Sequence, residues 1–268
     1  MIKLICSDID GTLLNAEREV SNKTKVEFHN IKDKLPIILI SSRMPSAIRH
    51  LQKDLGIENL PLVAYNGGLI LVDNEVKQST TLSFELVKKI IRLNKDSLHL
   101  SLYQKDKWYA PEQDQWTRRE INNTKVNPQI KNNNEVLDLW EPQQTGAHKI
   151  MCMGDPFLVN DFYIELSNKF SNDLHLYRSK DTYIEIAPKQ ISKRSAIEFL
   201  ISSEYKFKFS QVMSFGDNYN DIDMLQASGL GLAVGNAKEE VRAVADKIIG
   251  DAKKDGVAEF LSHYFKTK

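Results

Sequence analysis

Three continuous apolar runs divide the first 70 residues into short blocks. They cover residues 2–7 (IKLICS), 36–41 (PIILIS) and 61–65 (PLVAY), and none of them alternates with polar positions. Continuous runs of this length are typical of strands that are buried on both faces, as in a parallel sheet. The pattern therefore predicts three buried strands at the start of the chain.

Amphipathic segments separate these runs. Ser21 is expected to cap a helix whose apolar positions are Val26, Phe28 and Ile31. Pro45 suits the first turn of a second helix. Strands that alternate with helices at this spacing predict an α/β fold with a parallel sheet and right-handed crossovers.

The middle of the chain follows another pattern, with no glycine in residues 69–145. Residues 98–102 alternate apolar and polar side chains, which predicts an antiparallel sheet with one solvated face. Residues 84–93 and 157–170 are expected to form amphipathic helices, and the Asn- and Lys-rich residues 122–134 a loop.

The end of the chain returns to the first style, with helix-like and strand-like segments alternating from residue 192 onward. We therefore expect a core domain of residues 1–82 and 188–268. A smaller α/β domain of residues 83–187 would be inserted into it.

Composition narrows the class of protein. Lys and Arg total 36 and Asp and Glu total 36, so the formal net charge is zero and a nucleic-acid partner is not expected. No apolar run approaches the roughly 18 residues that a membrane span requires, and residues 1–7 do not resemble a signal peptide. Two distant cysteines in apolar surroundings, Cys6 and Cys152, favour a reducing, cytoplasmic location. We expect a monomer or a homodimer.

Two aspartates directly follow the first predicted strand, in the sequence Asp8-Ile9-Asp10-Gly11-Thr12. Ligands of open parallel sheets bind beyond the carboxyl ends of the strands, so both carboxylates are expected near a crevice. The alternative is a turn in which an Asp side chain binds nearby backbone N–H groups.

A second acidic cluster, Gly216 to Asp221, follows the predicted strand VMSF. Oxygen-rich clusters of this kind suit Mg²⁺, which prefers carboxylates, water and substrate phosphate. A helix that is capped by Asn220 and has an acidic first turn would explain the same residues without a ligand.

Two basic residues complete the pattern. Arg43 follows Ser41 and Ser42 at the end of the second strand, and Lys193 begins a later helix. An isolated basic residue usually faces solvent. Here the order along the chain is informative: an acid pair is followed by a serine, a lysine and a second acid pair.

This ordered set resembles the haloacid dehalogenase (HAD) superfamily of phosphatases over essentially the whole chain. Asp8 to Thr12 is similar to its DxDGT motif and Asp217 to Asp221 to its GDxxND motif, with Ser41 and Lys193 between them. The inserted segment after Asn66 and the Gly235-Asn236-Ala237 string resemble the Cof-type, subfamily IIB sugar phosphatases. The resemblance implies a Rossmann-like core with a C2B-type α/β cap.

The resemblance also implies roles for the matching residues. Asp8 would attack phosphorus and form an aspartyl-phosphate, and Asp10 would act as general acid and then as general base. The implied Mg²⁺ ligands are Asp8, the main-chain carbonyl of Asp10, and Asp217. The implied phosphate-binding residues are Ile9, Ser41, Ser42, Lys193 and Asn220. The implied supporting residues are Thr12, Arg43, Asn66 and Asp221.

The physical chemistry agrees with that assignment. A carboxylate cannot approach a phosphate dianion unaided, and Mg²⁺ with Lys193 would neutralise the repulsion. The sequence departs from the usual pattern at Ser42, Gln190 and Arg194, where the family commonly has glycine. None of these departures removes a catalytic group.

The expected activity is Mg²⁺-dependent hydrolysis of small phosphorylated metabolites, in particular sugar phosphates. A phosphomutase that uses the same phosphoenzyme is the alternative reaction. A phospho-accepting receiver module and a binding protein without catalysis are alternatives from other classes. A dinucleotide-binding enzyme is disfavoured because no G-x-G-x-x-G follows the first strand. Within the insertion, His148, Lys149, Arg178, Tyr183 and Glu185 are each expected to be structural rather than substrate-binding.

Overall fold

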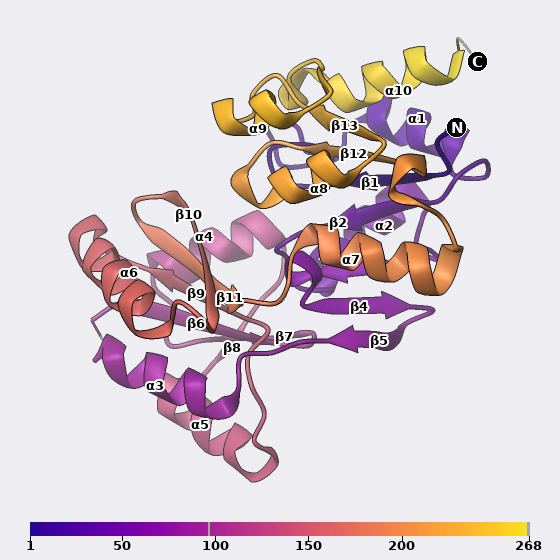
Figure 1. Ribbon diagram of the computed structural model, residues 1–268. Helices are drawn as coiled ribbons and strands as arrows, with labels where there is room; N and C mark the ends of the chain where they lie inside the picture. The colour runs from indigo at the N-terminus through magenta and orange to yellow at the C-terminus, as the bar shows by residue number, and fades with distance from the viewer. Residues whose placement is uncertain (96, 267–268) are drawn as a thin grey trace. The chain divides into compact units, whose positions relative to one another are not determined.

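The computed structural model describes residues 1–95 and 97–266, which form two compact units. The first unit comprises Met1–Ser42, Ile48–Lys77 and Ser192–Lys268, and the second comprises Arg43–Ala47 and Gln78–Ile191. Each unit contains its own sheet (Figure 1). The α/β class with a parallel sheet is confirmed, and each unit is described below by itself.

The first sheet has the strand order β14-β13-β12-β1-β2-β3-β4-β5. Its strands are β1 (Leu4–Ser7), β2 (Ile37–Ile40), β3 (Leu62–Ala64), β4 (Leu69–Val72), β5 (Glu75–Ser79), β12 (Val212–Gly216), β13 (Leu230–Ala233) and β14 (Lys247–Ile248). The strands from β14 to β3 pair in parallel, and β4 pairs antiparallel with β3. Every residue of β1, β2 and β12 is buried, as the continuous apolar runs predict.

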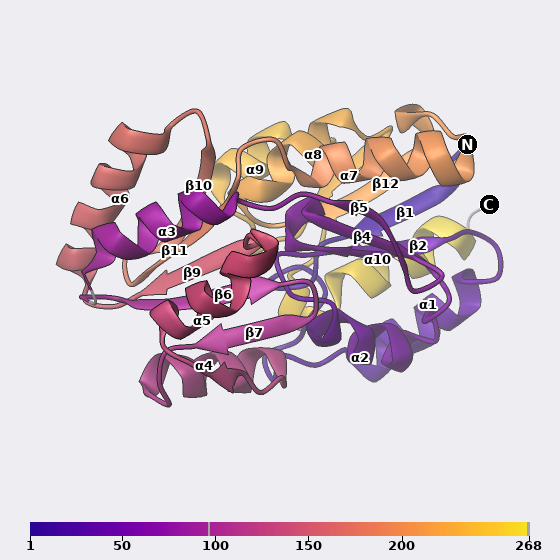
Figure 2. The same cartoon turned by 90° about the horizontal axis from the view of Figure 1, so that it is seen from below.

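Helices cover both faces of this sheet. They are α1 (Asn22–Ile31), α2 (Ser46–Leu55), α7 (Lys193–Leu200), α8 (Ile222–Ala227), α9 (Glu239–Val244) and α10 (Gly256–Lys266). Figures 1 and 2 show α1, α2 and α10 on one face and α7 and α8 on the other, and α1 packs directly against α10. Right-handed crossovers place the consecutive helices α1 and α2 on the same face.

The first helix differs in detail from its prediction. Ser21 caps it as expected, and its side chain accepts a hydrogen bond from the Thr24 N–H. Of the three apolar positions, Phe28 and Ile31 are buried, whereas Val26 is exposed. At 100° per residue Val26 lies off the buried stripe, where Thr24 takes the inward position.

The second sheet has the order β10-β11-β9-β6-β7-β8 and is antiparallel except at the β7–β8 pair. Its strands are β6 (His99–Gln104), β7 (Lys107–Ala110), β8 (Gln129–Ile130), β9 (Lys149–Met153), β10 (Leu174–Lys180) and β11 (Tyr183–Pro188). Its helices are α3 (Phe84–Asn94), α4 (Gln115–Thr124), α5 (Asn133–Trp140) and α6 (Pro156–Phe170). The expected helices over residues 84–93 and 157–170 are confirmed as α3 and α6.

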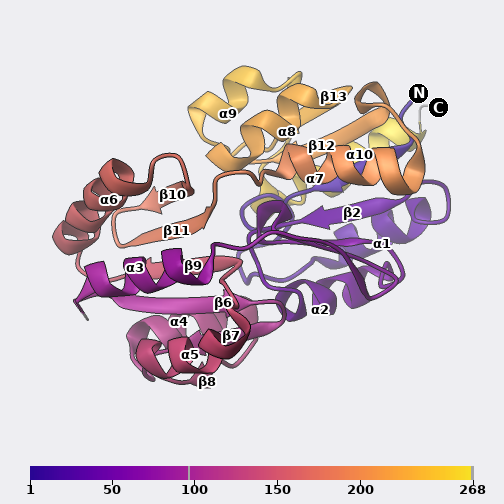
Figure 3. The ribbon, with the colours of Figure 1, turned by 60° about the horizontal axis from the view of Figure 1, so that its bottom comes forward.

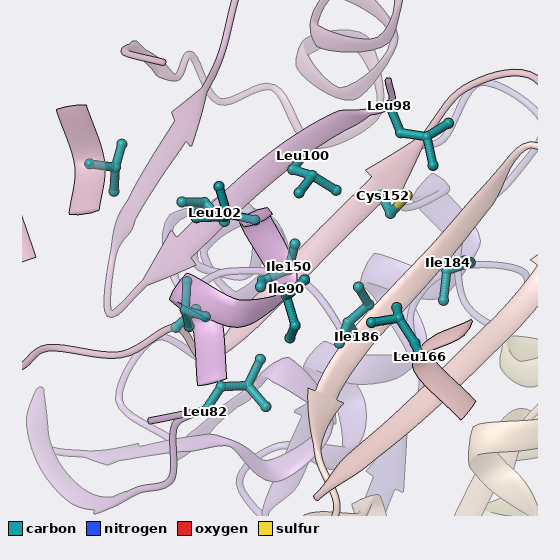
Figure 4. Close-up of a cluster of buried hydrophobic side chains, with 14 of the residues drawn as sticks. Leu82, Ile90, Leu98, Leu100, Leu102, Ile150, Cys152, Leu166, Ile184 and Ile186 are labelled. Atoms are coloured by element: carbon teal, nitrogen blue, oxygen red, sulfur yellow. The ribbon is translucent and has the colours of Figure 1, made fainter. Parts of the chain in front are cut away.

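One hydrophobic core holds the second unit together (Figure 4). Leu100, Ile150 and Ile184 project from three neighbouring strands into this core, and none of them is exposed. Helices α3, α5 and α6 supply the facing apolar side chains, and α6 also packs against the β10–β11 hairpin (Figure 3). Alternate strand residues face one side of a sheet, which explains how these strands bury one continuous surface.

Strand β6 does not have the solvated face that its alternating pattern predicts. His99 and Ser101 are both buried. The imidazole of His99 pairs with Asp114, the N-cap of α4, and the Trp108 indole N–H donates to Ser101 Oγ. These hydrogen bonds satisfy polar groups that an alternating pattern alone would assign to water.

Two further expectations fail in part. Residues 122–134 are not one loop, because they contain the end of α4, strand β8 and the start of α5. The sequence reasoning also missed the β4–β5 hairpin, although Asp73 and Asn74 at its turn both adopt positive φ, as a two-residue hairpin loop requires. Within the described residues, no helix combines the length and hydropathy needed to cross a membrane.

Candidate active site

The carboxyl ends of β12, β1 and β2 place the predicted site residues on neighbouring loops. Ser7 of β1 is paired with Phe215 of β12 and with Leu39 of β2. Asp8, Ser41 and Asp217 follow these paired positions within two residues. A site at the carboxyl edge of a parallel sheet is where ligands of such folds bind.

A buried lysine lies between two carboxylates at this edge. Lys193 Nζ is 2.5 Å from Asp8 Oδ1 and 2.6 Å from Asp221 Oδ1. The Lys193 and Asp221 side chains are fully buried, and Asp8 is nearly so. Such a set is stable only when the charges are paired and hydrogen-bonded, because an unpaired charge here would be costly.

The helix N-terminus that presents Lys193 is fixed by a capping box. Ser192 caps α7, and its hydroxyl accepts from the Ser195 N–H while Ser195 Oγ accepts from the Ser192 N–H. Both orphan donors of the first turn are thereby satisfied. Lys193 is thus held at the first helical position, where the two carboxylates compensate its unfavourable place at the positive end of the helix dipole.

Asp221 is fully engaged by the protein itself. Its Oδ1 accepts from Lys193, and its Oδ2 accepts from the backbone N–H groups of Asp217 and Asn218. The structure therefore makes Asp221 the residue that orients both the lysine and the Asp217 loop. The N-cap of this turn is Asn218, so the alternative in which Asn220 caps a helix is wrong.

Burial shifts the pKa values of this cluster. Desolvation raises the pKa of Asp8, with Asp221 and Asp10 acting in the same direction and Lys193 opposing them. The pKa of Asp217 is raised by burial and by the charges of Asp8 and Asp221. Burial alone would lower the pKa of Lys193, but Asp221 and Asp8 outweigh it and leave that pKa raised. Lys193 is therefore charged at neutral pH, and the acidic cluster has more negative charge than it can accommodate unaided.

The donor set fits a hard cation. Asp8, Asp217 and Asp221 each offer a carboxylate oxygen within 4.8 Å of the others. Among the described residues, Asp8 Oδ2 is a buried oxygen without a hydrogen-bond partner, whereas both oxygens of Asp221 are used by Lys193 and by backbone N–H groups. Carboxylate oxygens are ligands that Mg²⁺ prefers. Asp8 and Asp217 are accordingly the residues that fit as ligands.

The Gly11 turn brings the first motif against Asp217. Gly11 has φ of 89°, and a Cβ at this position would overlap the Asp217 carboxylate. Thr12 Oγ1 donates to Asp217 Oδ1 over 3.1 Å. Asn236 Nδ2 donates to the Gly11 carbonyl over 2.8 Å. The two acidic motifs are therefore joined by direct contacts across more than 200 residues of sequence.

Asp10 lies at the rim of this cluster and is partly exposed. Its Oδ1 is 3.0 Å from Nη2 of Arg18, whose side chain is 41 % exposed. Arg18 adopts φ of 62° in a turn that is closed by the Asn15 and Glu19 backbones. The sequence reasoning missed Arg18, because an isolated arginine between polar residues carries no periodic signal and its partner is set by the turn.

The loops after β2 and β3 contact each other and the loop after β12. The Asn66 N–H donates to the Ser41 carbonyl, and Asn220 Nδ2 donates to Asn66 Oδ1 over 3.0 Å. Asn66 is buried and adopts φ of 55°, a left-handed conformation that asparagine tolerates better than most residues. Asn66 thus holds the Asn220 carboxamide, a contact that the sequence did not predict.

The remaining predicted residues are placed as follows. Ile9 is buried, and its carbonyl accepts from the N–H groups of Leu13 and Leu14. Ser42 is half-buried at the end of a first-unit segment. Arg43 belongs to the second unit, where its guanidinium donates to the carbonyls of Ala47 and Asn123, each over 3.2 Å.

A buried lysine between carboxylates at the edge of a parallel sheet defines the site of an α/β enzyme. The chain matches the model of the haloacid dehalogenase-like hydrolases over residues 5–261 and belongs to that family. The family resemblance inferred from the motifs is confirmed, and the protein is a hydrolase of this class.

Relatives match the chain over nearly its full length. A Haemophilus influenzae protein provisionally described as a phosphatase is 30% identical over 272 residues, covering 99% of each chain. The 5-amino-6-(5-phospho-D-ribitylamino)uracil phosphatase of Bacillus subtilis is 29% identical, covering 98% of this chain and 96% of its own.

Solved structures share the fold. A haloacid dehalogenase-like hydrolase from Bacteroides thetaiotaomicron has a TM-score of 0.88 at 25% identity, covering 98% of this chain and 100% of its own. The HAD subclass IIB sugar phosphatase BT4131 has a TM-score of 0.81 at 22% identity, covering 98% of each chain. At that identity the second likeness concerns the fold alone.

Proposed function

We propose that the protein is a Mg²⁺-dependent phosphatase that hydrolyses phosphate monoesters of small metabolites through a phosphorylated Asp8. The observation that carries this proposal is the buried set of Asp8, Lys193 and Asp221 beside Asp217. It combines one carboxylate with an unengaged oxygen and one fixed positive charge, which are the groups that phosphoryl transfer requires.

In the first step, an oxygen of Asp8 attacks phosphorus and the bond from phosphorus to the alcohol oxygen breaks. Lys193 stays protonated, because two carboxylates raise its pKa, and it offsets charge on the transferring group. Ser41 and Asn220 lie on the flanking loops and would donate hydrogen bonds to the same group. Asp8, Asp217 and the Asp10 carbonyl would hold Mg²⁺, which when bound supplies Lewis-acid stabilisation of the phosphate oxygens.

Asp10 is assigned the proton transfers. It protonates the departing alcohol, and in the second step it takes a proton from the water that attacks phosphorus and releases Asp8. Asp10 is suited to this work because its side chain is at the rim of the site rather than within the buried cluster. Its ion pair with Arg18 would orient the carboxylate before substrate binds.

Sugar phosphates and related polyol phosphates are the proposed substrates. Support comes from the B. subtilis relative, whose name gives a phosphorylated ribityl compound. The second unit, residues 78–191, would act as the cap that covers the reacting groups. Both cysteines are free and buried, which favours a reducing, cytoplasmic setting.

A screen of phosphorylated metabolites for released inorganic phosphate, with Mg²⁺ and with EDTA, tests the proposal. We expect phosphate release from several sugar phosphates with Mg²⁺ and none with EDTA. Asp8→Asn should abolish release, whereas Asp223→Asn, the same change at a nearby exposed residue, should retain it. Isomerised hexose phosphate without free phosphate would contradict hydrolysis and identify a phosphomutase.

A further inference from the structure

A cavity of about 250 Å³ opens next to Asp10 in the first unit. Its polar lining comes from Asp10, Asn15, Arg18, Asn236 and Lys253. These residues belong to three separate loops: the turn after β1, the loop after β13 and the segment that precedes α10. Neither the motifs nor the comparisons assign a role to this cavity.

Asn236 is hydrogen-bonded to two walls of the cavity, the turn after β1 and the segment before α10. Its Nδ2 donates to the Gly11 carbonyl over 2.8 Å, and its Oδ1 accepts from the Ala252 N–H over 2.9 Å. The Lys253 N–H in turn donates to Asp251 Oδ1 over 2.8 Å. The turn after β1 and the backbone that carries Lys253 are therefore held in a fixed arrangement before any ligand arrives.

Arg18, in the turn after β1, adopts a strained backbone conformation. Its φ of 62° is a left-handed conformation that a residue with a Cβ rarely adopts. The Arg18 N–H donates to the Asn15 carbonyl, and the Glu19 N–H donates to Asn15 Oδ1. Strain of this kind persists where the surrounding structure over-determines it, and it gathers at functional sites.

The position of the cavity identifies what it would hold. Under the proposed function, Asp10 gives its proton to the alcohol oxygen that leaves phosphorus, so the leaving group must lie within hydrogen-bond reach of Asp10. Asp10 lies in the wall of the cavity, so a leaving group that reaches Asp10 can extend into it, and the volume of the cavity suits a small fragment of a metabolite.

The charge of the lining selects the kind of leaving group. Arg18 and Lys253 are positive, and Asp10 is neutral while it holds the proton for the leaving group, so the ionisable lining residues then carry a positive surplus. An anionic group offsets that surplus and accepts hydrogen bonds, whereas a neutral alcohol gains no such charge compensation.

We propose that this cavity is a leaving-group subsite that binds a second anionic group of the phosphorylated substrate. The inference rests on the proposed phosphatase activity and predicts that, among sugar and polyol phosphates, those with an additional carboxylate or phosphate bind most tightly. Lys253 is the specificity residue that distinguishes them from phosphate esters of neutral alcohols.

A matched pair of substrates tests the subsite. 3-Phosphoglycerate and glycerol 3-phosphate share a carbon skeleton and differ by a carboxylate against a hydroxymethyl group. We expect the Mg²⁺-loaded wild-type protein to have a KM, or a Ki against p-nitrophenyl phosphate, at least about threefold lower for 3-phosphoglycerate. Lys253→Gln should remove that preference.

Lys254→Gln is the control, because Lys254 is also an exposed lysine but does not line the cavity. This variant should keep the preference of the wild type. If the wild type has equal KM or Ki values for 3-phosphoglycerate and glycerol 3-phosphate, the subsite proposal alone is wrong. The same holds if Lys253→Gln still prefers 3-phosphoglycerate. Absence of p-nitrophenyl phosphate hydrolysis would instead overturn the proposed function and the subsite with it.

Discussion

At the scale of single residues, Asp221 illustrates how a site can depend on a carboxylate that touches no substrate. Its two oxygens bind Lys193 and the backbone of the Asp217 loop. We therefore expect Asp221→Asn to lower kcat about 100-fold or more through misplacement of Lys193. Because it also weakens a buried charge pair, the free energy of unfolding should fall by about 3 kcal/mol. Steady-state kinetics and urea denaturation measure both effects, and Asp223→Asn is the matched control.

Asn66 provides a second test at this scale. Because its backbone is left-handed, replacement by glycine removes only the side chain, whereas replacement by alanine also adds backbone strain. Asn66→Gly and Asn66→Ala both remove the hydrogen bond to Asn220, and each should raise KM about fivefold. Only alanine is strained at φ of 55°, so Asn66→Ala should be about 1 kcal/mol less stable than Asn66→Gly. Different KM values for the two variants would mean that Asn66 does not act by holding Asn220.

The residues of the site were predictable to different degrees. Asp8, Lys193 and Asp217 stand at strand ends and helix starts, which the apolar runs locate directly. Arg18 and Asn236 act through contacts with Asp10 and Gly11, and Asn236 is 225 residues distant from Gly11 in sequence. Neither periodicity nor composition encodes such contacts, because turn geometry and loop packing determine them.

At the scale of elements, His148 joins the chain before β9 to two other segments of the second unit. Its Nε2 contacts Ser79 Oγ, and its Nδ1 accepts from the Lys105 N–H. Burial, assisted by the charge of Lys105, lowers the pKa of His148 to about 4. The neutral ring is thus the form that the fold contains.

This shift predicts a loss of stability in acid. In the unfolded chain His148 binds a proton near the ordinary histidine pKa, whereas in the folded chain it does so only near pH 4. The stabilisation from the neutral ring is therefore fully present above about pH 6.5 and is lost as the pH falls toward about 4. The loss from His148 should reach about 3 kcal/mol. Urea denaturation across that range should give a steeper pH dependence for the wild type than for His148→Asn, which retains an acceptor but does not titrate. The same pH dependence of the unfolding free energy in both proteins would contradict the lowered pKa of His148.

Continuous apolar runs identified the parallel strands of the first unit, because such strands are buried on both faces. The same reasoning failed for β6, since His99 and Ser101 are buried through hydrogen bonds rather than through apolar character. It also failed for residues 122–134, where capping by Asn132 starts α5 within a segment of polar composition. Local composition identifies polarity, but specific partners decide whether a polar residue is buried.

At the scale of the whole molecule, the acidic cluster links stability to cation binding. The raised pKa values of Asp8 and Asp217 mean that the folded state without a cation holds protons that the unfolded chain has lost. Its stability therefore falls as the pH rises from the ordinary aspartate range toward neutrality and above. A bound cation replaces those protons and relieves the repulsion.

Thermal unfolding with and without Mg²⁺ measures this linkage. We expect Mg²⁺ to raise Tm more at about pH 8 than at about pH 6, because fewer protons compete with the cation. Asp217→Asn should remove the increase, and Asp223→Asn should preserve it. An increase that does not depend on pH or on Asp217 would place the cation elsewhere.

The central claim is that Asp8 becomes phosphorylated, and Asp10→Asn with p-nitrophenyl phosphate tests it most directly. p-Nitrophenolate leaves without a proton, so this variant should still form the phosphoenzyme but lack the base that hydrolyses it. We predict a burst of one p-nitrophenolate per protein molecule, followed by reduction of Asp8 to homoserine when borohydride is added, detected by peptide mass. Asp8→Asn should give neither the burst nor the reduced residue. Turnover by the wild type, with no burst and an unmodified Asp8 in Asp10→Asn, would contradict the account.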